Sequence, residues 1–216
     1  MDNGPTCVEM NLLAIETSVP HASLCLHLQG EQCFYAEWEA ERNHDAHLFP
    51  ALQQAMDKVA TTNGLDYILV GAGPGSYGGV RVALAAGVGI ATVTGAKLVA
   101  VESWEQLAEG DACVIADARR GGWTVRFPDA RIEVLSHDEL KAVQNPLFSV
   151  EPAGTLEEKG ISSVSKVALV PTAAGLVGTW LRMSPEERDA AAARVAEPIY
   201  VRPPHITKAT RKPWEI

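Results

Sequence analysis

A glycine-rich turn between two apolar segments is the part of the sequence whose residue types and spacing could do chemistry. Gly73, Gly75 and Gly78 in the stretch GAGPGSYGG (71–79) satisfy the pattern G-x-G-x-x-G, which brings a pyrophosphate close to backbone at a helix N-terminus. Glu102 ends the next apolar segment, where dinucleotide-binding folds keep an acid for the ribose. A nucleotide-binding enzyme that uses this turn is therefore one hypothesis.

Three observations favour a structural role for the same turn. Pro74 removes one of the N–H groups that would face a phosphate, and no Gly-Lys-Ser/Thr follows as in a Walker loop. The chain also opens with three consecutive strand patterns, whereas the dinucleotide fingerprint belongs to the first βαβ unit of a parallel sheet. In this interpretation the glycines allow a sharp turn and close helix packing, and Ser76 caps the helix that follows.

Histidines and carboxylates are the other candidates for chemistry. His44 and His47 share a helix face, which is half of a metal site, but the order His-Asp-Ala-His lacks the HExxH pattern; a metallopeptidase is a further alternative. Glu16 and Asp117 each close an apolar strand, where a carboxylate can bind Mg²⁺, activate water or simply pair with arginine. Arg81 stands at a helix start, where the dipole disfavours a cation, so we expect an acidic or backbone partner. These groups form no complete catalytic constellation.

Composition and charge narrow the class of protein. The chain has 216 residues, 47% of them hydrophobic, with 18 Lys and Arg against 27 Asp and Glu, so the formal net charge is −9. This is typical of a globular protein and disfavours binding of bare nucleic acid by the chain alone. No apolar run reaches the roughly 18–20 residues of a membrane span. The first ten residues carry acids and no base, which is unlike a signal peptide.

The charge is unevenly distributed along the chain. Residues 1–60 hold nine acidic and two basic residues, a net of −7, whereas residues 201–216 hold four basic and one acidic residue, a net of +3. The basic end is either a solvated tail or a clasp for an acidic surface or RNA. None of the four cysteines forms a CxxC pair or a zinc pattern, so we expect reduced thiols in a cytosolic protein. They are Cys7, Cys25, Cys33 and Cys113.

Hydrophobic periodicity predicts two α/β lobes. In the first, we expect a meander of strands at 11–17, 22–28 and 31–41, further strands at 67–72 and 97–102, and helices at 44–60, capped by Asn43, and 79–94. In the second, we expect strands at 112–117, 123–127, 131–135 and 166–170, and helices at 172–183 and 184–195. Capping boxes are predicted at Ser103/Gln106, Ser136/Glu139 and Ser184/Glu187. The expected lobes are 11–104 and 111–200, with tails at 1–10 and 203–216.

The helix predicted after the glycine turn has no polar face. Residues 82–96 (VALAAGVGIATVTGA) contain no charged side chain, and small or apolar residues surround the whole circumference. One side can pack on the sheet of its own lobe. The other side needs a further helix of this chain or a partner subunit, so the sequence predicts an interaction surface here.

Several motifs together resemble one family. They are LLAIETS (12–18), His44 with Leu48 and Pro50, GAGPGSYGGVRVALAAGVGIA (71–91), ADARRGG (116–122) and EPIYVR (197–202). In order and spacing they are similar to the motifs of the TsaB family, also called YeaZ, over nearly the whole chain. The chain departs from the usual pattern at a few positions: Glu16 for Asp, Asp45 for Ser, Gly78 for Thr, and Gly122 and Trp123 after the D-A-R turn.

The resemblance implies an α/β protein with the actin-like ATPase (ASKHA) fold, made of two RNase H-like lobes with mixed sheets flanked by helices. It implies a non-catalytic scaffold or dimerisation subunit that partners and activates a TsaD-like catalytic subunit, together with a TsaE-like ATPase, in forming threonylcarbamoyladenosine in tRNA. Such a chain is cytoplasmic, forms a homodimer when alone, meets tRNA only through the complex and contacts no membrane. It has no catalytic, metal or cofactor residues of its own, and ATP is used by the partner subunits.

The resemblance also assigns residues by position. The signature turn is Gly73, Pro74, Gly75, Ser76, Gly79 and Arg81. The partner-binding helices are 44–60 and 79–94, which in such chains pack into a four-helix bundle with the partner. The expected contact residues are His44, Leu48, Leu52, Val80, Leu84 and Val88.

Overall fold

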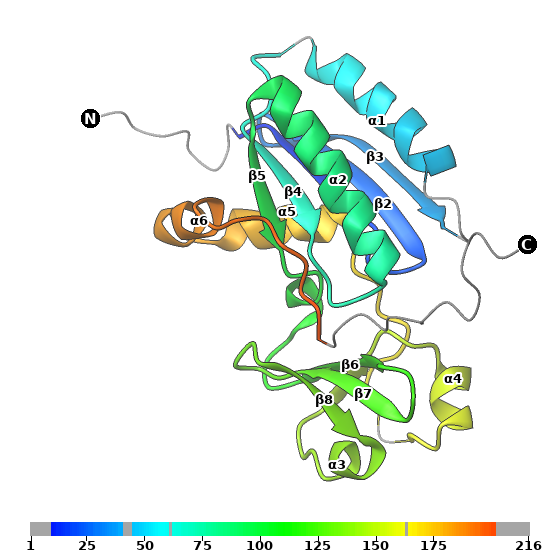
Figure 1. Ribbon diagram of the computed structural model, residues 1–216. Helices are drawn as coiled ribbons and strands as arrows, with labels where there is room; N and C mark the ends of the chain where they lie inside the picture. The colour runs from blue at the N-terminus through cyan, green and yellow to red at the C-terminus, as the bar shows by residue number, and fades with distance from the viewer. Residues whose placement is uncertain (1–9, 41–44, 61, 163, 202–216) are drawn as a thin grey trace, which may run out of the picture.

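The computed structural model describes residues 10–40, 45–60, 62–162 and 164–201, and it contains two lobes, each built on one sheet (Figure 1). The first sheet has five strands in the order β3-β2-β1-β4-β5. They are β1 (Leu12–Glu16), β2 (His21–Leu28), β3 (Glu31–Glu39), β4 (Tyr67–Gly71) and β5 (Lys97–Val101). The first three pair antiparallel, which confirms the predicted meander, and β4 and β5 add in parallel.

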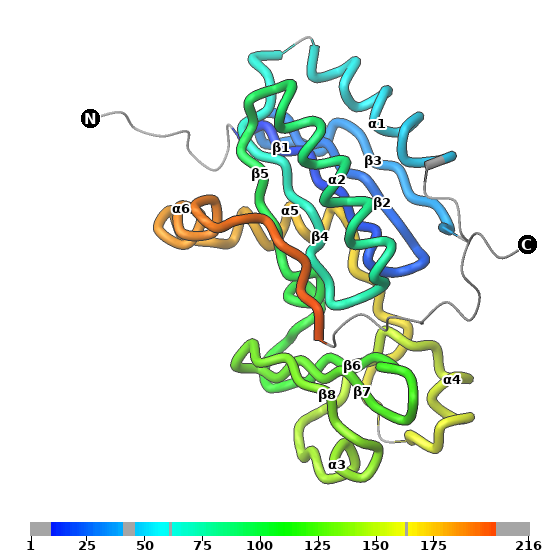
Figure 2. Tube along the Cα trace, in the orientation of Figure 1, coloured from blue at the N-terminus to red at the C-terminus, as the bar shows by residue number. Residues whose placement is uncertain are grey.

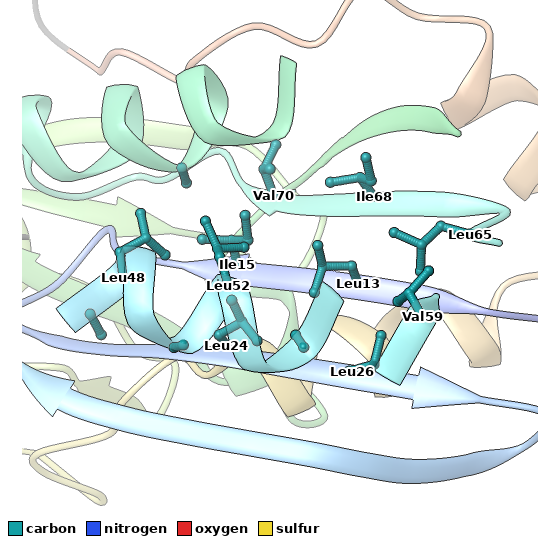
Figure 3. Close-up of a cluster of buried hydrophobic side chains, with 14 of the residues drawn as sticks. Leu13, Ile15, Leu24, Leu26, Leu48, Leu52, Val59, Leu65, Ile68 and Val70 are labelled. Carbon is teal, nitrogen blue, oxygen red and sulfur yellow. The ribbon is translucent and has the colours of Figure 1, made fainter. Parts of the chain in front are cut away.

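Alternation along the first sheet produces two separate cores. Leu13 and Ile15 face one side, where α1 (Asp45–Val59) and α2 (Tyr77–Thr94) cover the sheet (Figure 3). Leu12 and Ala14 face the other side, where α5 (Ala173–Arg182) packs. Because successive side chains of a strand point to opposite faces, both faces of this sheet are apolar and both are covered by helices. The first lobe is therefore a three-layer α/β/α structure.

The second lobe is smaller. Its sheet has the order β8-β7-β6-β9, from β6 (Cys113–Asp117), β7 (Gly122–Arg126), β8 (Ile132–Ser136) and β9 (Leu147–Ser149). Cys113, Ile115 and Trp123 share one core with α3 (His137–Lys141) and α4 (Ala153–Glu158). A short 3₁₀ helix (Glu105–Leu107) follows β5 and leads into this lobe.

Of the three capping boxes predicted at helix starts, the structure confirms two. The capping boxes at Ser136/Glu139 and Ser184/Glu187 are confirmed in full. The box at Ser103/Gln106 is wrong, because both side chains bond to distant segments: Ser103 Oγ accepts from the Gly73 N–H (3.1 Å), and Gln106 Oε1 accepts from the Thr172 N–H (2.9 Å). The proposed cap Asn43 lies outside the described residues.

The strand predicted at 166–170 is also wrong. This segment makes a single parallel bridge, from Lys166 to Phe148, and the fourth strand of the sheet is β9 instead. A three-residue strand such as β9 is too short to leave a periodic signal in the sequence. The helix α4 was missed for a similar reason, since it has only six residues.

The two C-terminal helices return to the first lobe. The helices α5 and α6 (Pro185–Ala192), expected in the second lobe, pack against the first sheet. The Ala173 N–H donates to Ser23 Oγ of β2 (2.8 Å), which anchors the start of α5. The assignment of 111–200 to one lobe is therefore corrected for 173–192, because the apolar face of α5 covers the first sheet. Met10, expected in the N-terminal tail, is buried in the same core.

The helix α2 is long and apolar enough to meet the length and hydropathy criteria for a membrane-spanning helix. Its 18 residues have a mean hydropathy of 1.3, so by length and composition alone it could cross a membrane. This corrects the expectation that no apolar run is long enough. One such helix is weak evidence for a membrane span, because core helices of globular proteins pass the same test.

Candidate functional site

The glycine turn joins β4 to α2 and is packed tightly on the loop after β1. A Cβ atom added to Gly75 or Gly79 would overlap backbone oxygens of Ser18 or Thr17. The Ser76 N–H donates to the Ser18 carbonyl (2.6 Å), and Thr17 Oγ1 donates to the Gly79 carbonyl (2.7 Å). The close backbone approach that a dinucleotide fold reserves for pyrophosphate is thus used here for a neighbouring loop of the chain.

The start of α2 agrees with the structural interpretation of the turn. Ser76 Oγ accepts from the Gly79 N–H, as expected of an N-cap. Gly73 has a left-handed φ of +91°, which favours glycine, and it exchanges two hydrogen bonds with Ser103. Pro74, Gly75 and Ser76 line the cleft between the lobes.

The two strand-end carboxylates have different surroundings. Glu16 is fully buried, and burial raises the pKa of its carboxyl group. Its Oε1 accepts from the Ser18 N–H (2.7 Å), while Oε2 has no hydrogen-bond partner among the described residues. A sealed carboxyl group of this kind is more stable protonated, and it is not among the residues that line the cleft.

Asp117 does line the cleft, at the end of β6. Partial burial opposes its ionisation, but Lys159 Nζ at 3.0 Å and the Arg119 N–H at 2.9 Å outweigh that effect, and its pKa is lowered. Its own N–H donates to Glu151 Oε1 (3.1 Å). Asp117 is therefore an ionised group that already holds a cation, and it does not meet Glu16 in one site.

Glu102, considered above as a ribose-binding acid, is bound to the second lobe instead. Its Oε1 accepts a hydrogen bond from Arg126 Nε of β7, and both side chains are largely buried. Burial raises the pKa of Glu102, and Arg126 opposes this. The pair links the end of β5 to β7 and so helps to fix the two lobes relative to each other.

The cleft between the lobes has a volume of about 710 Å³. Its walls are the loop after β1, the glycine turn, the β6–β7 hairpin and the segment after α6, which runs from α6 to the junction of the lobes (Figure 2). At its mouth, the rings of Tyr77 and Tyr200 stack with centroids 5.0 Å apart. Arg81 lies over Tyr77, 5.1 Å from the ring centroid, so its partner is an aromatic ring, not the acidic or backbone group that we expected.

The histidine pair falls at the start of α1. His47 is exposed on α1, and His44 lies outside the described residues. Within the described ranges, no three His, Cys, Asp or Glu side chains are grouped to hold a metal ion. The three cysteines in those ranges, Cys25, Cys33 and Cys113, are free thiols, as expected.

Most of the expected partner contacts are buried inside the first lobe. Leu48, Leu52, Val80 and Leu84 belong to the core between the first sheet and the helices α1 and α2. The resemblance assigned them by position, but they lie on the stripes of the two helices that face the sheet of their own lobe. Of the described candidates, only Val88 is exposed, at 53%.

The sequence predicted that α2 has an interaction surface, but it did not identify most of the residues that form it. Val93 is 86% exposed, and Ala85 and Gly89 are also exposed beside Val88. The Tyr77–Tyr200 pair was missed entirely, because its members are 123 positions apart (200 − 77) and nothing in the sequence pairs them. Only the resemblance of EPIYVR to a C-terminal motif marked Tyr200.

Comparisons with known proteins agree with one another on the family. Residues 38–171 match the model of the family TsaD, described as tRNA N6-adenosine threonylcarbamoyltransferase. Over 80 residues the chain is 34% identical to the tRNA threonylcarbamoyladenosine biosynthesis protein TsaB of Buchnera aphidicola subsp. Baizongia pistaciae. That match covers 37% of this chain and 36% of the relative, so the chain spans about a third of the length of that curated protein.

Two solved structures share the fold. One is a crystal structure of an uncharacterized protein with similarity to peptidase YEAZ from Pseudomonas aeruginosa, with a TM-score of 0.67 and 22% identity over 89% of this chain and 100% of that one. The other is YeaZ from Pseudomonas aeruginosa, with a TM-score of 0.64 and 23% identity over 88% and 99% of the two chains. They support the expected actin-like, two-lobed α/β fold.

Proposed function

The chain belongs to the TsaD family, in its TsaB (YeaZ) branch, and on this premise we propose that it is a non-catalytic subunit in the formation of threonylcarbamoyladenosine in tRNA. Its task is to bind a TsaD-like catalytic subunit and bring it to an active state, with a TsaE-like ATPase as the third member. The nucleotide is then used by those partners, in the cytoplasm, and this chain needs no cofactor of its own.

The single observation that carries this proposal is the exposed apolar face of α2. Val88 and Val93 lie on it with Ala85 and Gly89, and small residues permit a second helix to approach closely. Phe49 of α1 is also exposed and apolar, on the helix that covers the same face of the sheet. Exposed apolar patches of this kind mark protein–protein contacts. The same face serves a homodimer when the partner is missing.

The surroundings of the carboxylates support a role without chemistry. Glu16 is sealed from solvent, and Asp117 already pairs with Lys159. Glu16 does not reach the cleft, and Asp117 lines it but is held by Lys159, so neither carboxylate is the free general base that a hydrolytic or transfer reaction would require.

Light scattering on a size-exclusion column tests the proposal. We expect the chain alone to form a concentration-dependent dimer, and a mixture with the TsaD-like protein of the same organism to form a one-to-one complex. If no complex forms even with the TsaE-like protein and ATP present, the likeness is one of fold only and the proposed function is wrong.

The variant Val88→Glu locates the surface. An unpaired charge buried in the contact should weaken complex formation at least a hundredfold, by about 3 kcal/mol or more. The matched control is Val195→Glu, which places the same charge on a valine that is 80% exposed beyond α6. A complex that tolerates both variants equally would show that the partner binds elsewhere.

A nucleotide-dependent enzyme is the second candidate, since the cleft has space for a mononucleotide. Separate titrations with ATP and NAD test it. Micromolar binding that is lost in Gly75→Ala would favour this candidate over the scaffold. For the metallopeptidase alternative, stoichiometric metal found by elemental analysis would be needed.

A further inference from the structure

Two tyrosines at the mouth of the interlobe cleft stack on each other without being buried. The ring planes of Tyr77 and Tyr200 are 29° apart, yet the residues remain 45% and 44% exposed. Tyr77 is the first residue of α2, and Tyr200 is held in place by its neighbour Ile199, whose N–H donates to the Ala72 carbonyl (2.8 Å). The chain thus presents a preformed aromatic surface that is open to solvent.

Cationic side chains surround this aromatic surface on both lobes. Arg81 is exposed beside Tyr77, and Arg119, which lines the same cleft, has an 88% exposed side chain. Arg120 follows it, exposed at the tip of the β6–β7 hairpin. Asp117 lines the cleft too, with a carboxylate oxygen 3.9 Å from the Arg119 guanidinium. In a chain of net charge −9, the three exposed arginines still give the mouth of the cleft a local basic rim.

Two residues that line the cleft have a buried hydrogen-bonding group without a partner among the described residues, the Ser18 hydroxyl and the Trp104 indole N–H. Trp104 is 99% buried and lines the cleft, and its Nε1–H has no partner within the described part of the chain. A buried indole N–H usually finds an acceptor. A ligand that enters the cleft with an acceptor atom would satisfy it.

We propose that the cleft mouth binds an unpaired nucleotide of an RNA strand. The base stacks on the Tyr77–Tyr200 pair, the flanking phosphates lie at Arg81 and Arg119, and an acceptor on the nucleotide reaches Trp104. Stacking on exposed aromatic rings between cations is how proteins hold single-stranded RNA. RNA is favoured over a free nucleotide because the cations lie on both sides of the mouth, where a continuing strand would leave it. This inference rests on the proposed function, which makes tRNA the source of the strand.

Fluorescence anisotropy on the full chain tests the site, with a labelled, unstructured 12-nucleotide RNA as the probe. Removing a stacking ring in Tyr200→Leu or Tyr77→Leu should weaken binding about tenfold, whereas Tyr200→Phe should bind like the original chain. Arg81→Gln should lower the slope of log K against log salt by about 0.7, one phosphate contact. The matched controls are Phe127→Leu and Arg131→Gln, an aromatic ring and an arginine 4.6 Å from its centroid on the β7–β8 hairpin, neither of which lines the cleft.

Three results would overturn the inference. They are no binding of the RNA by the original chain, an equal loss in the control variants, and displacement of the RNA by AMP at the same nucleotide concentration. The last result would assign the site to a free nucleotide. If Tyr200→Leu does not fold, Arg81→Gln still decides, since its side chain is exposed.

The same variants separate this inference from the proposed function. The size-exclusion assay with the TsaD-like protein is run on the original chain and on Tyr200→Leu. A complex that forms with both, together with RNA binding that is lost only in the variant, supports the inference. RNA binding that is unchanged in Tyr200→Leu overturns the inference while leaving the proposed function intact. Failure of complex formation by the original chain overturns the proposed function, while the anisotropy still reports on the cleft.

Discussion

Two apolar helices, α2 and α5, cover opposite faces of the same sheet, and they end up in different environments. On α5, Leu176 and Trp180 are fully buried, and its start is tied to Ser23 of β2 and Gln106. On α2, Val80 and Leu84 are buried in the same way, but Val93 on the opposite side and Val88 at the edge between the two sides are exposed. Both helices therefore stabilise the first lobe, and only α2 has apolar surface left over.

The difference between α2 and α5 shows how the side of a helix that can bind a partner is distinguished from the side that packs in the core. The side of α2 toward the sheet is filled by Leu and Val with close contacts at Gly87, whose added Cβ would meet Val70 and Leu98. The solvent side has small residues and valines with nothing from the described chain over them. Burial along a helix, more than its composition, decides which residues a partner can reach.

The largest change in the free energy of unfolding is expected on the face of the sheet that α5 covers. Trp180→Ala removes a fully buried ring that lies 4.9 Å from that of Tyr67, so the free energy of unfolding should fall by about 3–5 kcal/mol. Urea denaturation followed by circular dichroism measures the change. A loss below 1 kcal/mol would mean that α5 is not required to cover this face.

A smaller loss is expected from the buried side of α2. Leu84→Ala should lower the free energy of unfolding by about 2–4 kcal/mol, because the side chain packs in the core of α1, α2 and the sheet. The same denaturation measurement applies. If the variant is as stable as the original chain but no longer forms a dimer, then Leu84 is a contact residue, as the family resemblance implied, and does not belong to the core.

The fold was largely predictable because its first lobe rests on long periodic elements. The strand β3 alternates Trp38 with Glu37 and Glu39, and the structure buries the first and exposes the other two. Where elements are short, as in β9, or where a polar side chain bonds far along the chain, as with Ser103, local patterns gave the wrong answer. The return of α5 to the first lobe depends on tertiary packing, which no local pattern encodes.

The sequence predicted that the candidate site is a contact surface, but not which residues form it. The absence of a polar face on residues 82–96 indicated a contact surface, but two of the residues that the family resemblance assigned to it, Val80 and Leu84, face the core. A partner-facing residue such as Val93 follows no rule that a sequence shows, since it is simply the apolar residue left outside. The Tyr77–Tyr200 pair depends on a long-range contact and could be found only in the structure.

The strand shared by both helices ends in Glu16, and this residue predicts a pH dependence. Burial raises the pKa of its carboxyl group above 4.5 in the folded state, so the folded protein holds the proton more tightly than the unfolded chain. The free energy of unfolding should therefore fall as the pH rises above about 4.5, and level off once the folded pKa is passed. In Glu16→Gln, which does not ionise, this part of the dependence should disappear.

Urea denaturation of both proteins across this pH range isolates the effect of Glu16, since all other titrating groups are shared. The difference in free energy of unfolding should move in favour of Glu16→Gln as the pH rises. A difference that is constant with pH, or that moves in favour of the original chain, would show that Glu16 is ionised in the fold and held by a partner.

The smallest effect on stability is expected at the exposed side of α2. Val93 is 86% exposed, so Val93→Gln should change the free energy of unfolding by less than about 0.5 kcal/mol, as for other surface substitutions. The measurement is made at a concentration at which light scattering shows only monomer, so that lost dimer contacts do not contribute. A loss of more than 1 kcal/mol there would show that this side of α2 is already covered within one chain. The contrast with α5 would then disappear, and with it the reason to expect a partner on α2.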